Sequence, residues 1–187
     1  MAPGAWTFIA AVVIGFIVAW GILTRNRLTR YVAHADASWR NIEAQLKRRW
    51  DIIPLLIDVA KGYAANETAI FERVARARVL SMDAQDPREQ AEAQQRLQDA
   101  LFALYAMTEG YPELQASENF GALQASLSET EDEIQESRRM YNAMVREINA
   151  AVFTFPRRII ASIFHFKPRD FYILSHEEED VMPRMGY

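Results

Sequence analysis

The chain has 187 residues, 50% of them hydrophobic and 25% charged, a length that allows one domain plus a short additional segment. It contains no cysteine, which excludes disulfides, thiolate metal sites and thiol nucleophiles. Its formal net charge of −4 provides no general attraction for polyphosphates, so we expect no nucleic-acid partner. Glycine is scarce outside the first 24 residues, which argues against turn-rich β architecture and glycine-rich phosphate loops.

The first 24 residues carry no charge at all. A helix from Ala5 to Leu23 would cover about 28 Å, the thickness of a hydrocarbon core. The sequence therefore predicts a transmembrane anchor over residues 1–24. Its large side chains are Trp6, Phe8, Ile9, Val12, Val13, Ile14, Phe16, Ile17, Val18, Trp20, Ile22 and Leu23.

Arginines at positions 25, 27 and 30 follow this segment directly. A cleaved signal peptide fits less well, because such a peptide carries its basic residues before the apolar core. By the positive-inside rule we expect a single-pass membrane protein with its body in the cytoplasm and a short N-terminus outside.

The body shows a helical pattern from Leu28 to Ala60, where apolar residues recur about every 3.6 positions. Pro54 lies off this stripe, and we expect it either to kink or to end the helix. Asn66 resembles an N-cap for a second, short helix.

Asp86-Pro87 signals a third helix start, and Gly110 would end that helix in a left-handed conformation. Ser117 with Glu118 opens a last long stripe that reaches Phe155. No stretch shows strict alternation of apolar and polar residues long enough for a strand. The predicted fold is all-α, a long antiparallel bundle of three to four helices over residues 25–167, followed by a C-terminal tail over residues 168–187.

Several blocks of the body resemble the LemA family. They are Gln45 to Pro54 (QLKRRWDIIP), Lys61 to Ala64 (KGYA), Ala75 to Arg78 (ARAR), Tyr111 to Leu114 (YPEL), Ser117 to Phe120 (SENF), Leu127 to Glu131 (LSETE), Arg138 to Asn142 (RRMYN) and Phe155-Pro156. The resemblance implies an N-terminally anchored bacterial membrane protein with a long helical bundle. The family includes a magnetosome-membrane protein, which implies a role in membrane biogenesis, but it brings no agreed activity and no catalytic residues. Asn66 departs from the histidine that the family often has before Glu67.

The residues themselves offer no catalytic, cofactor-binding or metal site. The three histidines, His34, His165 and His176, never stand four apart on a helix. Carboxylates four apart, such as Glu129 and Glu133, lack the Glu-x-x-His partners of a diiron bundle. The acidic run from His176 to Asp180 lacks the spacers of a calcium loop, so we expect a solvated tail and no cofactor.

Three segments are candidates for interaction. Lys47, Arg48 and Arg49 could meet acidic residues between Glu129 and Glu133, within the chain or in another copy, and in-chain pairing or a solvated face is expected. Tyr111, Pro112 and Phe120 belong to a loop that either binds a partner or only ends and restarts helices.

The third segment, from Phe153 to Phe166, combines apolar side chains with basic ones. Its candidate residues are Arg157, Arg158, Ile159, Ile163, Phe164 and Phe166. We expect a short amphipathic helix after Pro156 that is buried as a cap on the bundle, and the alternative is a helix in the bilayer interface. Four antiparallel passes would return it to the membrane, whereas a first helix unbroken to about residue 83 would leave it at the distal tip.

These features favour a non-enzymatic, membrane-anchored helical scaffold that self-assembles and organises or shapes the bacterial membrane. Its expected partners are the lipid bilayer, further copies of the chain and a membrane protein. The alternative is an adaptor that presents partners or stress signals to a membrane protease, which suits the resemblance.

Overall fold

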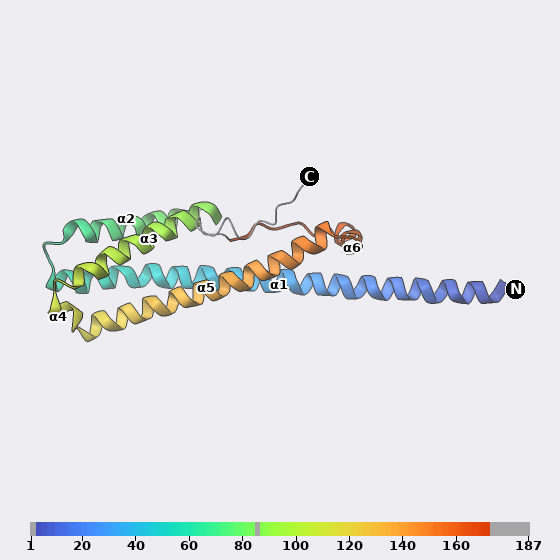
Figure 1. The fold of residues 1–187 in the computed structure, drawn as a ribbon, viewed down its shortest axis with the longest axis horizontal. Helices are drawn as coiled ribbons and strands as arrows, with labels where there is room; N and C mark the ends of the chain where they lie inside the picture. The colour runs from blue at the N-terminus through green and yellow to red at the C-terminus, as the bar shows by residue number, and fades with distance from the viewer. Residues whose placement is uncertain (1–2, 85–86, 173–187) are drawn as a thin grey trace. The chain divides into compact units, whose positions relative to one another are not determined.

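The computed structural model describes residues 3–84 and 87–172, and in these ranges all regular structure is helical (Figure 1). The helices are α1 (Pro3–Tyr63), α2 (Thr68–Asp83), α3 (Pro87–Thr108), α4 (Pro112–Gln115), α5 (Glu118–Phe153) and α6 (Arg157–Ile163). The predicted all-α fold is therefore confirmed. The acidic run at 176–180 lies outside the described residues.

Helix α1 runs without a break for 61 residues and contains Pro54. The proline does not end the helix, so of the two expectations for this position the break is wrong. The helix stops at Tyr63, directly after Gly62, and α2 begins after a short turn.

The other helix boundaries follow the local signals, with two corrections. The N-cap of α2 is Glu67, without a side-chain capping hydrogen bond, so the assignment to Asn66 was wrong by one residue. Gly110 does not have a positive φ, because α3 ends in a turn in which its amide donates to the Met107 carbonyl. The predicted left-handed end was therefore wrong. Ser117 does cap α5, since its Oγ accepts from the Phe120 amide at 3.4 Å.

The chain divides into two compact units, each described on its own. Unit 2 comprises residues 39–139 with residues 171–187, of which the structure describes 171 and 172. In it the chain passes up and down in α1, α2, α3 and α5, and α2 packs along α3 (Figure 1).

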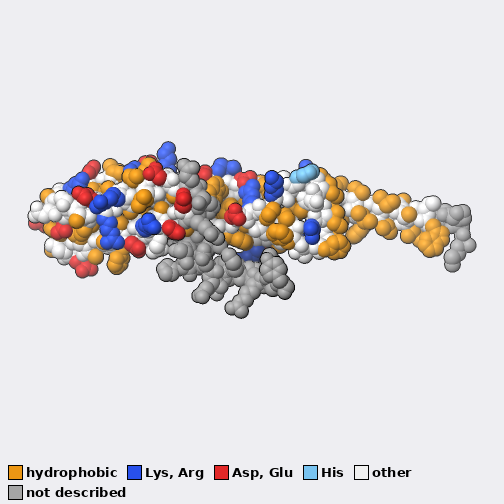
Figure 2. Space-filling view, turned by 90° about the horizontal axis from the view of Figure 1, so that it is seen from above, with side chains coloured by type: hydrophobic (Ala, Val, Ile, Leu, Met, Phe, Trp, Pro, Cys, Tyr) orange, Lys and Arg blue, Asp and Glu red, His pale blue; other side chains and the backbone are white. Residues whose placement is uncertain are grey.

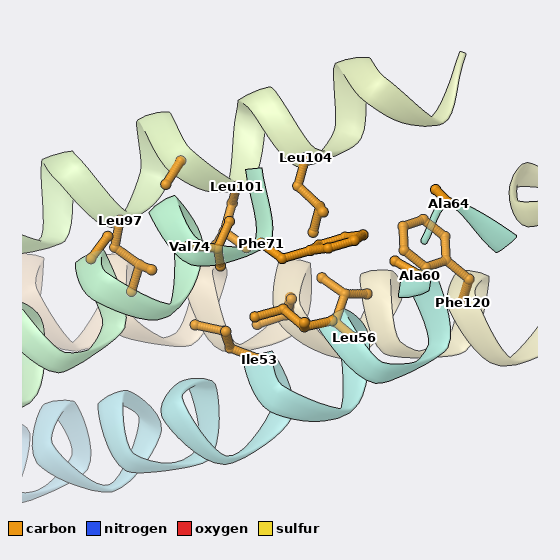
Figure 3. Packing of buried hydrophobic residues seen from close by; sticks show 14 of the residues in the cluster. Ile53, Leu56, Ala60, Ala64, Phe71, Val74, Leu97, Leu101, Leu104 and Phe120 are labelled. Carbon is orange, nitrogen blue, oxygen red and sulfur yellow. The ribbon is translucent and has the colours of Figure 1, made fainter. Parts of the chain in front are cut away.

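The core of unit 2 forms where these helices turn their apolar stripes inward (Figure 3). Its buried residues include Ile53, Leu56 and Ala60 of α1, Phe71 and Val74 of α2, Leu97, Leu101 and Leu104 of α3, Leu114 of α4, and Phe120 and Leu127 of α5. The C-terminal part of the stripe that the sequence predicted in the first helix, Ile53, Ile57 and Ala60, thus belongs to this core.

Unit 1 comprises residues 1–38 and 140–170. Its small core joins Leu28 of α1, Ala151 of α5 and Ala161 of α6, each 1% exposed, with Val152 and Phe166 packed against them. The chain therefore returns to the beginning of the body after four passes (Figure 1). Of the two topologies that the sequence left open, the three-pass one is wrong because α1 ends at Tyr63.

Candidate functional site

The described part of the chain contains one helix long and apolar enough to cross a membrane, the N-terminal part of α1. All large side chains of the predicted anchor are exposed except Trp20, which is half-buried; the values run from 51% for Val13 to 75% for Phe16. Hydrophobic side chains cover this stretch, whereas charged side chains of both signs cover the helices of the body (Figure 2). A soluble bundle would bury such a helix face.

The predicted basic cluster is paired within unit 2. Arg49 is only 5% exposed, lies 2.6 Å from a carboxylate oxygen of Glu131 in α5, and donates to the side-chain oxygen of Gln94 in α3 at 3.1 Å. Arg48 forms an exposed pair with Glu129 at 2.8 Å, and Lys47 is exposed. Arg49 thus ties three helices together, and its burial requires this compensation because an unpaired buried charge is costly.

A second set of polar contacts involves the next residue of α1, Trp50, and was not predicted from the sequence. Pro54 has no amide hydrogen, so the carbonyl of Trp50 loses its helical donor. Arg78 of α2 replaces it, because its Nε donates to the Trp50 carbonyl at 2.6 Å. The Trp50 indole in turn donates to the hydroxyl of Ser81, which is fully buried. Two family-like blocks, QLKRRWDIIP and ARAR, therefore meet in a structural contact between α1 and α2.

The predicted loop also serves the fold. The Tyr111 hydroxyl donates to a carboxylate oxygen of Glu67 at 2.9 Å, a bond that raises the pKa of Tyr111. Phe120 and Leu114 are buried, whereas Pro112 is exposed at the start of α4.

The segment from Phe153 to Phe166 departs from expectation. We expected it to be buried, yet Phe153, Phe155, Ile159, Ile163 and Phe164 are 45–78% exposed. The short helix after Pro156 is confirmed as α6, but it buries Ala161 in the small core of unit 1 and not the larger side chains. Arg158 is exposed, and Arg157 and Phe166 are half-buried.

Tyr172 is a buried residue that the sequence analysis left within the tail. It is 1% exposed and its ring meets Trp39 edge-on, with centroids 5.9 Å apart. Burial raises the pKa of Tyr172 to about 12, and the charges of Arg138, Glu131 and Arg49 modify this shift.

This shift predicts a loss of stability at high pH. The unfolded tyrosine ionises near 10, whereas the folded one stays neutral up to about 12. Stability is therefore full well below pH 10 and falls above it, by about 1 kcal/mol at pH 11. We expect Tyr172→Phe to remove that part of the fall, as measured by urea denaturation between pH 9 and 11. An identical slope in the variant would contradict the prediction.

An open groove of about 580 Å³ runs between α1 and α2. Its lining includes Pro54, Ile57 and Lys61 of α1 with Phe71, Arg78 and Val79 of α2. Among the described side chains, no group of three or more histidines and carboxylates is arranged to hold a metal ion.

The comparisons with known proteins agree with this architecture. The sequence pattern of the LemA family matches residues 38–186. The chain is 23% identical over 177 residues to the magnetosome protein MamQ of Magnetospirillum gryphiswaldense, covering 81% of this chain and 65% of that protein. It is 26% identical over 139 residues to protein LemA of Metamycoplasma hominis, covering 73% of this chain and 63% of that protein. The matches thus span slightly less than two thirds of both relatives.

Proposed function

The chain belongs to the LemA family, and on that basis we propose that it is a non-enzymatic scaffold, anchored in the bacterial inner membrane by α1, that self-assembles to organise or shape the membrane. A relative named for the magnetosome supports the membrane part of this proposal. The exposed apolar stretch of α1 supports the anchor, and the arginines that follow it favour a cytoplasmic body.

Self-assembly is supported by two exposed faces of opposite charge in unit 2. A shallow depression between α2 and α3 carries Arg73, Arg76 and Arg96 with one acidic residue, Asp99. The outer face of α5 carries Glu129, Asp132, Glu133 and Glu136 with one basic residue, Arg139. Glu129 is paired with Arg48 and Glu136 with Arg139, in exposed ion pairs. This complementarity between two different faces is the observation that carries the self-assembly.

Pairing between these faces is head-to-tail, so each copy uses one face on each neighbour and the assembly grows into a ring or an array. The present partners of Arg76 and Arg96 are exposed residues one turn away, Glu72 and Glu92. Such pairs contribute at most about 1 kcal/mol each, so they exchange for partners in another copy at little cost.

Charge reversal tests the assembly. In proteoliposomes of the full chain we expect Arg73→Glu with Arg76→Glu, or Asp132→Lys with Glu133→Lys, to abolish self-crosslinking. Mixing the two variants should restore it, because each supplies the face that the other has lost. Glu113→Lys with Glu118→Lys changes the net charge as much as the acidic-face reversal, on exposed residues elsewhere, and should have no effect. Crosslinking that survives both reversals would contradict the proposed interface.

The adaptor remains the second candidate because of the groove between α1 and α2, whose mixed apolar and charged lining suits a peptide segment. Crosslinking from a Lys61→Cys variant of the full chain in native membranes distinguishes the two functions. Crosslinks from this position to one other protein, together with absent self-crosslinking, would favour the adaptor.

A further inference from the structure

Unit 1 carries an apolar patch outside the transmembrane stretch, the belt, which consists of Phe153, Phe155, Ile159, Ile163 and Phe164. Its members are 61%, 78%, 50%, 60% and 45% exposed. Contiguous exposed apolar side chains often mark a binding surface. All members of the belt belong to α6 or to the residues on either side of it.

The packing of α6 explains why these side chains point outward. Ala161 is buried in the small core of unit 1, beside Leu28 and Ala151. Ile160 lies along α1, where its Cδ1 is 3.4 Å from the position a Cβ would take at Gly21. The helix closes with His165 at a φ of 57° and the Phe166 amide donating to the Ala161 carbonyl at 2.9 Å. One side of α6 is therefore fixed against α1, and the opposite side is left free.

These contacts place the belt at the end of the membrane span. Gly21 is among the last residues of the uncharged stretch, and Arg25 is the first charged residue after it. The Arg25 guanidinium lies over the Phe164 ring, 5.0 Å from its centroid. Figure 1 shows α6 beside this part of α1. A bilayer that holds the span from Ala5 to Leu23 therefore has its headgroup layer at the level of α6.

The charge around the belt has one sign. No Asp or Glu occurs in residues 1–35 or in residues 150–169, although the whole chain is acidic. The basic residues of these ranges are Arg25, Arg27, Arg30, Arg157, Arg158, Lys167 and Arg169. Arg169 is paired with Asp36. The rest, which we call the basic collar, follow the span or flank the belt in the sequence, and basic residues next to apolar ones are typical of interfacial helices.

We propose that the belt inserts into the interfacial layer of the membrane and that Arg157, Arg158 and Lys167 bind the anionic headgroups beside it. This gives unit 1 a second bilayer contact beside the span. The inference rests on the anchor of the proposed function but not on self-assembly. The bilayer is the occupant, rather than a protein, because the belt is continuous with the span and shares its level.

The absence of cysteine allows the test to use single-cysteine variants of the full chain. Ile163→Cys reports on the belt, Ile14→Cys on the span, and Phe102→Cys on α3, where Phe102 is 75% exposed. Each is labelled with nitrobenzoxadiazole in vesicles of phosphatidylcholine and phosphatidylglycerol. We expect the fluorescence emission of the labels at 163 and 14 to shift to the blue and to be quenched by spin-labelled lipid. At position 163 a lipid with a shallow spin label should quench best. The label at 102 should show neither effect.

Each other outcome overturns the proposal in a distinct way. Quenching at 14 without quenching at 163 leaves the anchor intact and refutes the belt. A blue shift at 163 without lipid quenching means that protein covers the belt. Absent quenching at both positions refutes the anchor and, with it, this inference.

The basic collar has its own readout. Arg157→Gln with Arg158→Gln, in the Ile163→Cys background, should reduce quenching at 163 most in vesicles rich in phosphatidylglycerol. Arg40→Gln with Lys47→Gln removes the same charge from exposed residues of unit 2 and should change nothing. Equal quenching in all three proteins would refute the headgroup contacts.

Discussion

Arg49→Met is expected to lower the free energy of unfolding by about 3 kcal/mol. The change removes the cation that compensates Glu131 and the donor that reaches Gln94, while it keeps an unbranched apolar stem. The effect lies at the lower end for buried pairs because the Glu131 side chain stays 27% exposed. Urea denaturation of the detergent-solubilised full chain, followed by circular dichroism, measures it.

Arg48→Met is the matched control. Its pair with Glu129 is exposed, at 47% and 62%, so the expected loss is below about 1 kcal/mol. Adding Glu131→Gln to Arg49→Met should recover part of the stability, since the carboxylate then no longer lacks its cation. Equal losses of unfolding free energy for Arg48→Met and Arg49→Met would show that the contacts of Arg49 with α3 and α5 do not stabilise the fold more than an exposed ion pair does.

The second large effect concerns the carbonyl that Pro54 leaves without a helical donor. Arg78→Met should cost about 2 kcal/mol, because the bond from a charged donor to the Trp50 carbonyl is lost. In a Pro54→Ala background the same change should cost less, since the alanine amide then donates to that carbonyl within the helix.

This pair of substitutions forms a double-mutant cycle with an expected coupling of about 1–2 kcal/mol. Arg76→Met, on the neighbouring exposed arginine, serves as control and should stay within about 0.5 kcal/mol of the unsubstituted chain. If Arg78→Met costs the same with and without Pro54, the proline does not create the need for the arginine.

The sequence predicted the elements that depend on neighbouring residues. The anchor stretch, the helix starts at Pro87 and Glu118, and the short helix after Pro156 all follow from local composition, capping and proline geometry. The two wrong details, at Asn66 and Gly110, concern a single residue at a helix end, where several conformations satisfy the same backbone groups.

Contacts between distant residues were less predictable. The basic cluster could be matched to the acidic stretch of the fifth helix, but not Arg49 to Glu131 and Gln94, because the choice depends on the rotation of three helices. The contact of Arg78 with Trp50 needs the register of α2 on α1. The exposure of the belt was mispredicted because periodicity identifies an amphipathic helix but not which side finds a partner.

The proposed function depends on self-assembly of this LemA family chain from a membrane anchor. The most direct measurement is the mass of the full-length protein in mild detergent, determined by light scattering with the detergent contribution subtracted. We expect the mass to be a multiple of the chain mass and to fall to that of one copy in the variant Asp132→Lys with Glu133→Lys. A single copy at every concentration in the unsubstituted protein would contradict the proposed self-assembly.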